Sequence, residues 1–120
     1  MQSYKDLLVF KKSYEQAVEM YGLTKSFPRE EMFGLASQIR RAAVSIPLNI
    51  AEGYGKVEKG KELVRFLSMA KGSSAEMEVL LDLAKDIGYL SDDRHRQTME
   101  KQEEVGKMLT GLIRSVQSKT

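Results

Sequence analysis

The sequence predicts an all-α protein with the architecture of an up-down-up-down antiparallel four-helix bundle. Three observations carry this prediction. Apolar residues recur at every third or fourth position in four segments, the 120 residues include only two prolines, and no stretch alternates apolar and polar residues as a strand would. Helices joined by short turns pack antiparallel by default, so four successive helices give this bundle. The length suits one domain over residues 1–120.

The first helix is expected over about residues 4–25, where one face carries Leu7, Phe10, Tyr14, Ala17 and Tyr21. The second helix is expected over about residues 28–54. Pro28 suits its first helical position, and the acidic residues that follow suit the positive end of the helix dipole. Inside this helix, Pro47 predicts a kink because the apolar face resumes at Ile50. The alternative is two helices divided at Pro47.

The third helix is expected over about residues 57–88 and the fourth over about 92–117. The third has the most regular spacing of apolar residues. Gly88 is a typical residue to end a helix, and Ser91 is a typical N-cap for the next one. The fourth helix shows a weaker apolar pattern, formed by Val105, Leu109, Leu112 and Val116.

Composition excludes several classes of site. The chain has no cysteine, which excludes thiolate metal sites and thiol nucleophiles, and a single histidine, His95, argues against a histidine-based metal or catalytic site. No apolar run reaches the length of a membrane span, and the first residues lack a signal-peptide pattern. These features predict a cytoplasmic, non-enzymatic protein that has no cofactor, no metal site and no membrane association.

Apolar residues also occur on the far side of the second and third helices, away from the core stripe. A helix that is apolar on two faces is buried on two faces, so these residues predict a subunit interface in a homo-oligomer. The alternative is scattered surface hydrophobics, which are common. The interface candidates are Phe33, Val44, Leu48, Met69, Val79 and Leu83.

A polar stripe lies beside the core face of the same two helices. Its residues are Gln38, Arg41, Ser45, Asn49 and Glu52 on the second helix and Glu76 on the third. We expect a hydrogen-bonded network between helices, with Arg41 paired to a carboxylate. Small residues at Gly72 and Ser73 are expected to allow the helices to approach closely. The alternative is a catalytic acid and base formed by Glu52 and Glu76.

Charge is segregated along the chain. Residues 40–71 carry seven basic and three acidic side chains, whereas residues 76–104 carry four basic and nine acidic ones. The turn between the second and third helices should therefore be positive and is the candidate nucleic-acid-binding region. Its candidate residues are Arg40, Lys56, Lys59 and Lys61, with Tyr54 as a stacking platform for an unpaired base. The alternative is a solvated, charged loop.

Three stretches of the chain resemble the family of ribosomal RNA intervening-sequence proteins, which are small bacterial four-helix bundles. They are YKDLLVFKKSYEQAVEMY, FPREEMFGLASQIRRAAVSIPLNIAEGYGK and ELVRFLSMAKGSSAEMEVLL. The resemblance implies a four-helix bundle that assembles as a homopentamer. The family is similar in fold to the accessory proteins of diversity-generating retroelements, which associate with RNA and a reverse transcriptase.

Two functional hypotheses follow. The first is a non-enzymatic, oligomeric RNA-associated scaffold or accessory protein. The second is an adaptor that binds a partner protein, for example a reverse transcriptase, without direct nucleic-acid contact.

Overall fold

The computed structural model describes residues 3–55 and 60–119, and within these residues the all-α class and the four helices are confirmed. The four α-helices are α1 (Leu8–Thr24), α2 (Leu35–Gly55), α3 (Lys61–Asp86) and α4 (Asp92–Ser118). Two short 3-10 helices, η1 (Tyr4–Asp6) and η2 (Arg29–Glu31), precede α1 and α2. The described residues contain no strand.

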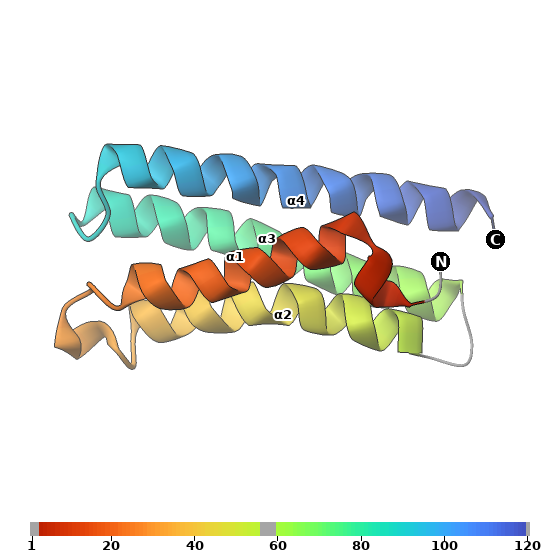
Figure 1. The fold of residues 1–120 in the computed structure, drawn as a ribbon, viewed down its shortest axis with the longest axis horizontal. Helices are drawn as coiled ribbons and strands as arrows, with labels where there is room; N and C mark the ends of the chain where they lie inside the picture. Colours follow the sequence, from red (N-terminus) through yellow and green to blue (C-terminus); the bar gives the residue numbers. More distant parts are fainter. Residues whose placement is uncertain (1–2, 56–59, 120) are drawn as a thin grey trace.

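The helices run lengthwise through a molecule that measures 45 × 23 × 20 Å. Successive helices run in opposite directions, so η1, the end of α2, the start of α3 and the end of α4 lie at one end (Figure 1). The α2–α3 contact is the most extensive and the α1–α4 contact is the least extensive of the four between neighbouring helices. The core lies between the four helices and includes Met20, Ile39, Leu67, Leu81 and Leu109, all fully buried.

The second helix begins seven residues later than the sequence predicts. Pro28 has extended backbone angles and precedes η2, and α2 begins only at Leu35. The carboxylate of Glu31 accepts a hydrogen bond from the backbone N–H of Leu35 at 3.1 Å. This bond satisfies one of the free N–H groups at the start of α2, so Glu31 caps the helix from outside it rather than lying within it.

The first helix also begins later than predicted. Tyr4–Asp6 form a 3-10 turn capped by Ser3, whose side chain accepts a hydrogen bond from the N–H of Lys5. Leu7 is extended, which separates this turn from α1. The apolar spacing that suggested one continuous helix from Tyr4 therefore spans a turn and a helix.

The remaining helix ends are close to their predicted positions. The third helix starts at Lys61, and the predicted residues 57–59 lie outside the described part of the chain. Gly88 has a φ of 89°, a conformation that favours glycine, just after α3 ends. The Ser91 side chain accepts a hydrogen bond from the N–H of Arg94, which confirms Ser91 as the N-cap of α4.

Pro47 lies inside α2, which continues as one helix to Gly55. The prediction of a single helix over this segment is therefore correct, and the alternative division at Pro47 is wrong. The close approach between α2 and α3 occurs at Gly53, where an added Cβ would lie 2.9 Å from Leu63 Cδ1 and 3.0 Å from Phe66 Cβ. Gly72, which we expected to allow this approach, is exposed with open space around it.

Candidate interaction surfaces

The large apolar side chains that remain exposed lie on α1, α2 and α3, just before the start of α2, or just after the end of α3. Among the described residues of α4 there is none. The exposed side chains are Leu8, Tyr14, Val18, Tyr21, Phe33, Leu48, Met69, Val79, Leu83 and Ile87. The exposed apolar side chains are therefore spread over the surfaces of α1, α2 and α3, and the outer surface of α4 is polar.

The predicted interface candidates are nearly all exposed in the single chain. Phe33 is 99% exposed, Val79 67% and Leu48 58%, and Met69 and Leu83 are each 46% exposed. Val44 is half-buried. Their exposure agrees with a contact surface, whereas the association of copies stays a prediction.

A groove of about 290 Å³ lies between α1 and α2 and is lined almost entirely by apolar atoms. We call it the α1–α2 groove. Its exposed lining residues include Tyr14, Val18 and Tyr21 from α1 and Leu48 from α2. Of these four, only Leu48 was a predicted interface residue, because Tyr14 and Tyr21 belong to the apolar stripe predicted for α1 and Val18 stands outside the spacing of that stripe.

Arg40 lies beside this groove and not at the α2–α3 turn, where the sequence analysis placed it. It precedes Gly55 by 15 residues, or roughly 22 Å along the helix. Its guanidinium stacks on the ring of Tyr21 at 4.8 Å, and its Nε donates a hydrogen bond to Thr24 Oγ1 at 2.8 Å. Arg40 is thus half-buried and already engaged by α1.

The other predicted nucleic-acid candidates have mixed outcomes. Lys61 is exposed in the first turn of α3, whereas Lys56 and Lys59 lie outside the described residues. Tyr54 belongs to the last turn of α2 and not to a loop, and its side chain packs against the core. Burial raises the pKa of the Tyr54 hydroxyl. The ring is only partly available for stacking on a base.

The fold brings together basic residues that are far apart in the sequence. Dividing each helix at its midpoint splits the described chain into two halves, and the half that holds η1, the end of α2 and the end of α4 comprises residues 3–15, 46–55, 60–72 and 106–119 (Figure 1). This half, the basic end, carries nine basic and four acidic residues. The opposite half, residues 16–45 and 73–105, is the acidic end and carries eight basic and twelve acidic residues. Lys5, Arg114 and Lys119 join Lys61 at the basic end.

The predicted polar network between α2 and α3 is largely absent. Ser45 and Ser73 hydrogen-bond through their hydroxyls, and Asn49 Nδ2 donates to the Ser45 carbonyl of its own helix at 2.8 Å. The other four residues of the stripe, Gln38, Arg41, Glu52 and Glu76, are exposed. Among the described residues, Arg41 has no ion-pair partner. Of the six stripe residues, only Ser45 forms a hydrogen bond across to α3.

Glu52 and Glu76 are also too far apart to act as a catalytic acid and base. Because Ser45 faces Ser73 in an antiparallel helix pair, Glu52 lies level with Phe66. Glu76 is ten residues further along α3, which corresponds to about 15 Å. In the described part of the chain, no three acidic or histidine side chains gather to hold a metal ion.

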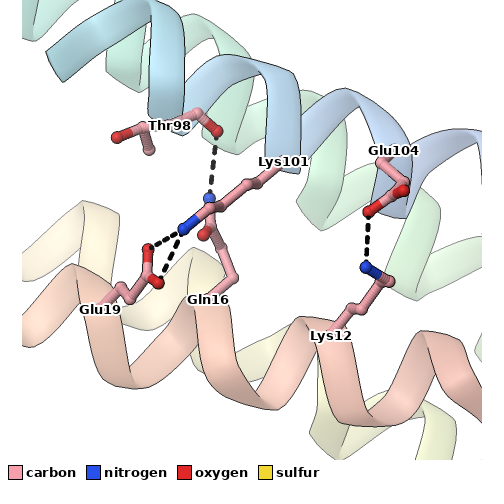
Figure 2. A network of polar contacts seen from close by, with 6 residues as sticks. All are labelled: Lys12, Gln16, Glu19, Thr98, Lys101 and Glu104. Carbon is pink, nitrogen blue, oxygen red and sulfur yellow. Dashed lines mark hydrogen bonds and ion pairs between the residues drawn. The ribbon is translucent and has the colours of Figure 1, made fainter.

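The buried polar contacts lie at α4 instead. Gln16 Nε2 donates to the Thr98 carbonyl at 3.2 Å, and the ion pairs Lys12–Glu104 at 3.0 Å and Lys101–Glu19 at 2.9 Å flank it on the outside (Figure 2). Gln102 Nε2 donates to Ser74 Oγ at 2.8 Å between α4 and α3. The sequence indicated that two of these residues face the core, because Thr98 and Gln102 precede Val105 and Leu109 at the same three- and four-residue spacing.

Acidic residues cluster where α3 meets α4 at the acidic end. Burial, with Glu103 and Asp82 nearby, raises the pKa of Glu78. His95 is half-buried and contacts Asp82 at 2.7 Å. No helix formed by the described residues is long and apolar enough to cross a membrane.

Comparison with known proteins places the chain. The model of the 23S rRNA-intervening sequence protein family matches residues 5–111. The chain belongs to this family. The match spans all of α1, α2 and α3 and most of α4, so it includes much of the fourth helix, whose sequence pattern was the weakest.

A crystal structure of another protein has the same fold. It is described as a protein of unknown function from the S23 ribosomal protein family of Bacteroides thetaiotaomicron. The two chains superpose with a TM-score of 0.82 at 27% sequence identity, covering 89% of this chain and 96% of the other. No curated protein shows significant similarity to the chain.

Proposed function

We propose that this family member is a non-enzymatic, oligomeric scaffold that associates with RNA through its basic end. The observation that supports the proposal is the surplus of basic residues at that end, supplied by α1, α3 and α4 together. Basic side chains that neutralise phosphates release counterions, so they supply binding energy that depends on salt and little on sequence. In a parallel oligomer each copy would add its basic end to the same rim.

The test is a titration of a labelled, structured RNA at low and moderate salt with two matched variants. The basic-end variant combines Lys5→Gln, Lys61→Gln and Arg114→Gln, all at exposed positions. The control removes the same charge at the acidic end through Arg29→Gln, Lys85→Gln and Arg94→Gln. We expect the basic-end variant to bind the RNA at least about tenfold more weakly than the wild type, with a shallower salt dependence. The control should bind the RNA like the wild type.

Two outcomes would contradict this proposal. One is a wild-type protein that does not bind the RNA at low salt. The other is an equal loss of affinity in both variants, which would show that net charge and not the basic end determines binding.

The exposed apolar side chains of α1, α2 and α3 support the oligomeric part of the proposal. The family resemblance suggests a pentamer. Leu48→Glu should dissociate the assembly, because burying an unpaired charge at the contact is costly. Sedimentation velocity at micromolar concentration measures this effect. Because Leu48 is exposed in the single chain, the variant should keep its helical content. A wild-type protein that sediments as a compact monomer would contradict the proposal.

The second candidate function is an adaptor that binds a partner protein, such as a reverse transcriptase, without contacting nucleic acid. The α1–α2 groove favours it, because a mostly apolar surface hollow is typical of protein–protein contacts. Absence of RNA binding by the wild type, together with saturable binding of a purified partner that Leu48→Glu weakens, would favour the adaptor.

A further inference from the structure

We infer that the copies associate through two unlike surfaces, with α3 of one copy seated in the α1–α2 groove of the next. This inference rests on the proposed homo-oligomer and specifies which surfaces meet. Such a head-to-tail contact leaves one free groove and one free α3 surface on every dimer, so it continues until a ring closes. Shape, charge and height along the bundle each support it.

The two surfaces are complementary in shape. The α1–α2 groove is a hollow with exposed aromatic and aliphatic side chains. The outer surface of α3 is a convex row at helical spacing, which we call the α3 ridge, consisting of Met69, Gly72, Glu76, Val79 and Leu83. All five are exposed, and Gly72 leaves open space beside the larger side chains. A ridge of this kind fits a hollow better than it fits a copy of itself.

The groove is bordered by positive charge. Lys11 and Lys25 are exposed and lie seven residues on either side of Val18, which places them on the same side of α1 as this groove residue. On the α2 side, Arg40 stacks on Tyr21 and Arg41 is exposed without an ion-pair partner in the described residues.

The α3 ridge is bordered by negative charge over its C-terminal half. Glu76 lies within the ridge, and the exposed Asp82 and Asp86 follow Val79 by three and seven residues, next to it on the helix surface. Glu76, like Arg41, has no ion-pair partner among the residues described. An acidic ridge and a basic groove border attract each other and disfavour ridge-to-ridge or groove-to-groove contacts.

The charged residues also lie at matching heights. The hydroxyl contact between Ser45 and Ser73 sets the register of α2 against α3. Arg41 precedes Ser45 by four residues and Glu76 follows Ser73 by three, so in this antiparallel pair they are nearly level. When a second copy stands beside the first in the same orientation, Glu76 of one therefore reaches the height of Arg41 of the other.

The apolar residues match at the same alignment. Leu48 lies three residues beyond Ser45, and Met69 lies four residues before Ser73, so Leu48 and Met69 are nearly level. Tyr14 lines the groove together with Leu48. An unshifted, parallel neighbour thus brings Met69 to the Tyr14–Leu48 part of the groove. All copies in such a ring point the same way, so their basic ends form one rim and their acidic ends the other.

The experiment uses two variants that each destroy one of the surfaces. Val18→Glu introduces a negative charge into the groove, opposite the acidic ridge, and Val79→Lys introduces a positive charge into the ridge, opposite the basic border. Val18 and Val79 are 60% and 67% exposed, so both variants should fold. Gln97→Glu and Gln97→Lys make charge changes of the same sign at an exposed site on α4 and serve as controls.

Native mass spectrometry or sedimentation velocity gives the outcome. We expect each variant alone to associate at least about tenfold more weakly and to run as the 13.6 kDa monomer, while both controls assemble like the wild type. An equimolar mixture pairs the intact ridge of one variant with the intact groove of the other, so it should associate although neither variant does so alone. That rescue would also show that both variants are folded.

The failures of the two proposals are distinguishable. A monomeric wild type would overturn the homo-oligomer and this inference with it. If the wild type assembles but either variant assembles equally well, or the mixture stays monomeric, the ridge-in-groove contact is wrong and the homo-oligomer stands.

Discussion

The α2–α3 and α1–α4 contacts hold the same bundle together by different means. The α2–α3 contact is extensive and close, with Gly53 against Leu63 and Phe66. The α1–α4 contact is the smallest between neighbouring helices and includes Gln16 buried against Thr98, with ion pairs outside it (Figure 2). Stability should therefore depend on side-chain volume at α2–α3 and much less on any single polar group at α1–α4.

The largest effect is expected at the close contact. Gly53→Val should lower the free energy of unfolding by about 3 kcal/mol, because its Cβ already meets Leu63 and Phe66 and its methyl groups have no room. Urea denaturation measures this change. Gly111→Val is the control, since an added Cβ there meets nothing within 4 Å and should change stability by less than about 0.5 kcal/mol. Equal losses in both variants would show that the α2–α3 spacing is not limiting.

A smaller effect of opposite sign is expected at the polar contact. Gln16 is buried, and its Oε1 has no hydrogen-bond partner. Gln16→Leu keeps a side chain of similar size and removes this unpaired oxygen, so we expect a gain of about 1 kcal/mol in the free energy of unfolding. A loss of 2 kcal/mol or more would mean that the Gln16–Thr98 hydrogen bond is essential to α1–α4 packing.

The smallest effect concerns the acidic residues between α3 and α4. Because burial and the nearby Glu103 and Asp82 raise the pKa of Glu78 in the folded protein, its ionisation is harder there than in the unfolded chain. The folded state therefore loses stability as the pH rises from the ordinary value of 4.5 through the raised pKa. Glu78→Gln removes this loss and should raise the melting temperature at pH 7 by about 1 °C.

The pH dependence of that gain is its control. Below the ordinary pKa of 4.5 the carboxyl is protonated in both states, so the advantage of Glu78→Gln should disappear there. Glu100→Gln, at an exposed site on α4, should show no such gain. A gain that persists unchanged in acid would contradict the electrostatic explanation.

The sequence by itself determined the helical class, the number of helices and five of the ten large apolar positions that are exposed in the described residues. These features follow from apolar spacing within a single helix, which is a local property: a residue such as Leu48 or Val79 falls off the core stripe of its own helix whatever lies beside it. The N-cap at Ser91 and the positive φ of Gly88 are local in the same way.

The tertiary structure decided which side chains meet. Arg40 stacks on Tyr21, Gln16 bonds to Thr98, and Glu31 caps α2 while accepting a hydrogen bond from Tyr89 Oη at 2.9 Å. Each contact joins residues whose neighbourhood depends on the direction and register of separate helices. The same holds for the basic end, because Lys5, Lys61 and Arg114 share it only when antiparallel helices bring their distant segments together, and no spacing within one helix encodes that arrangement.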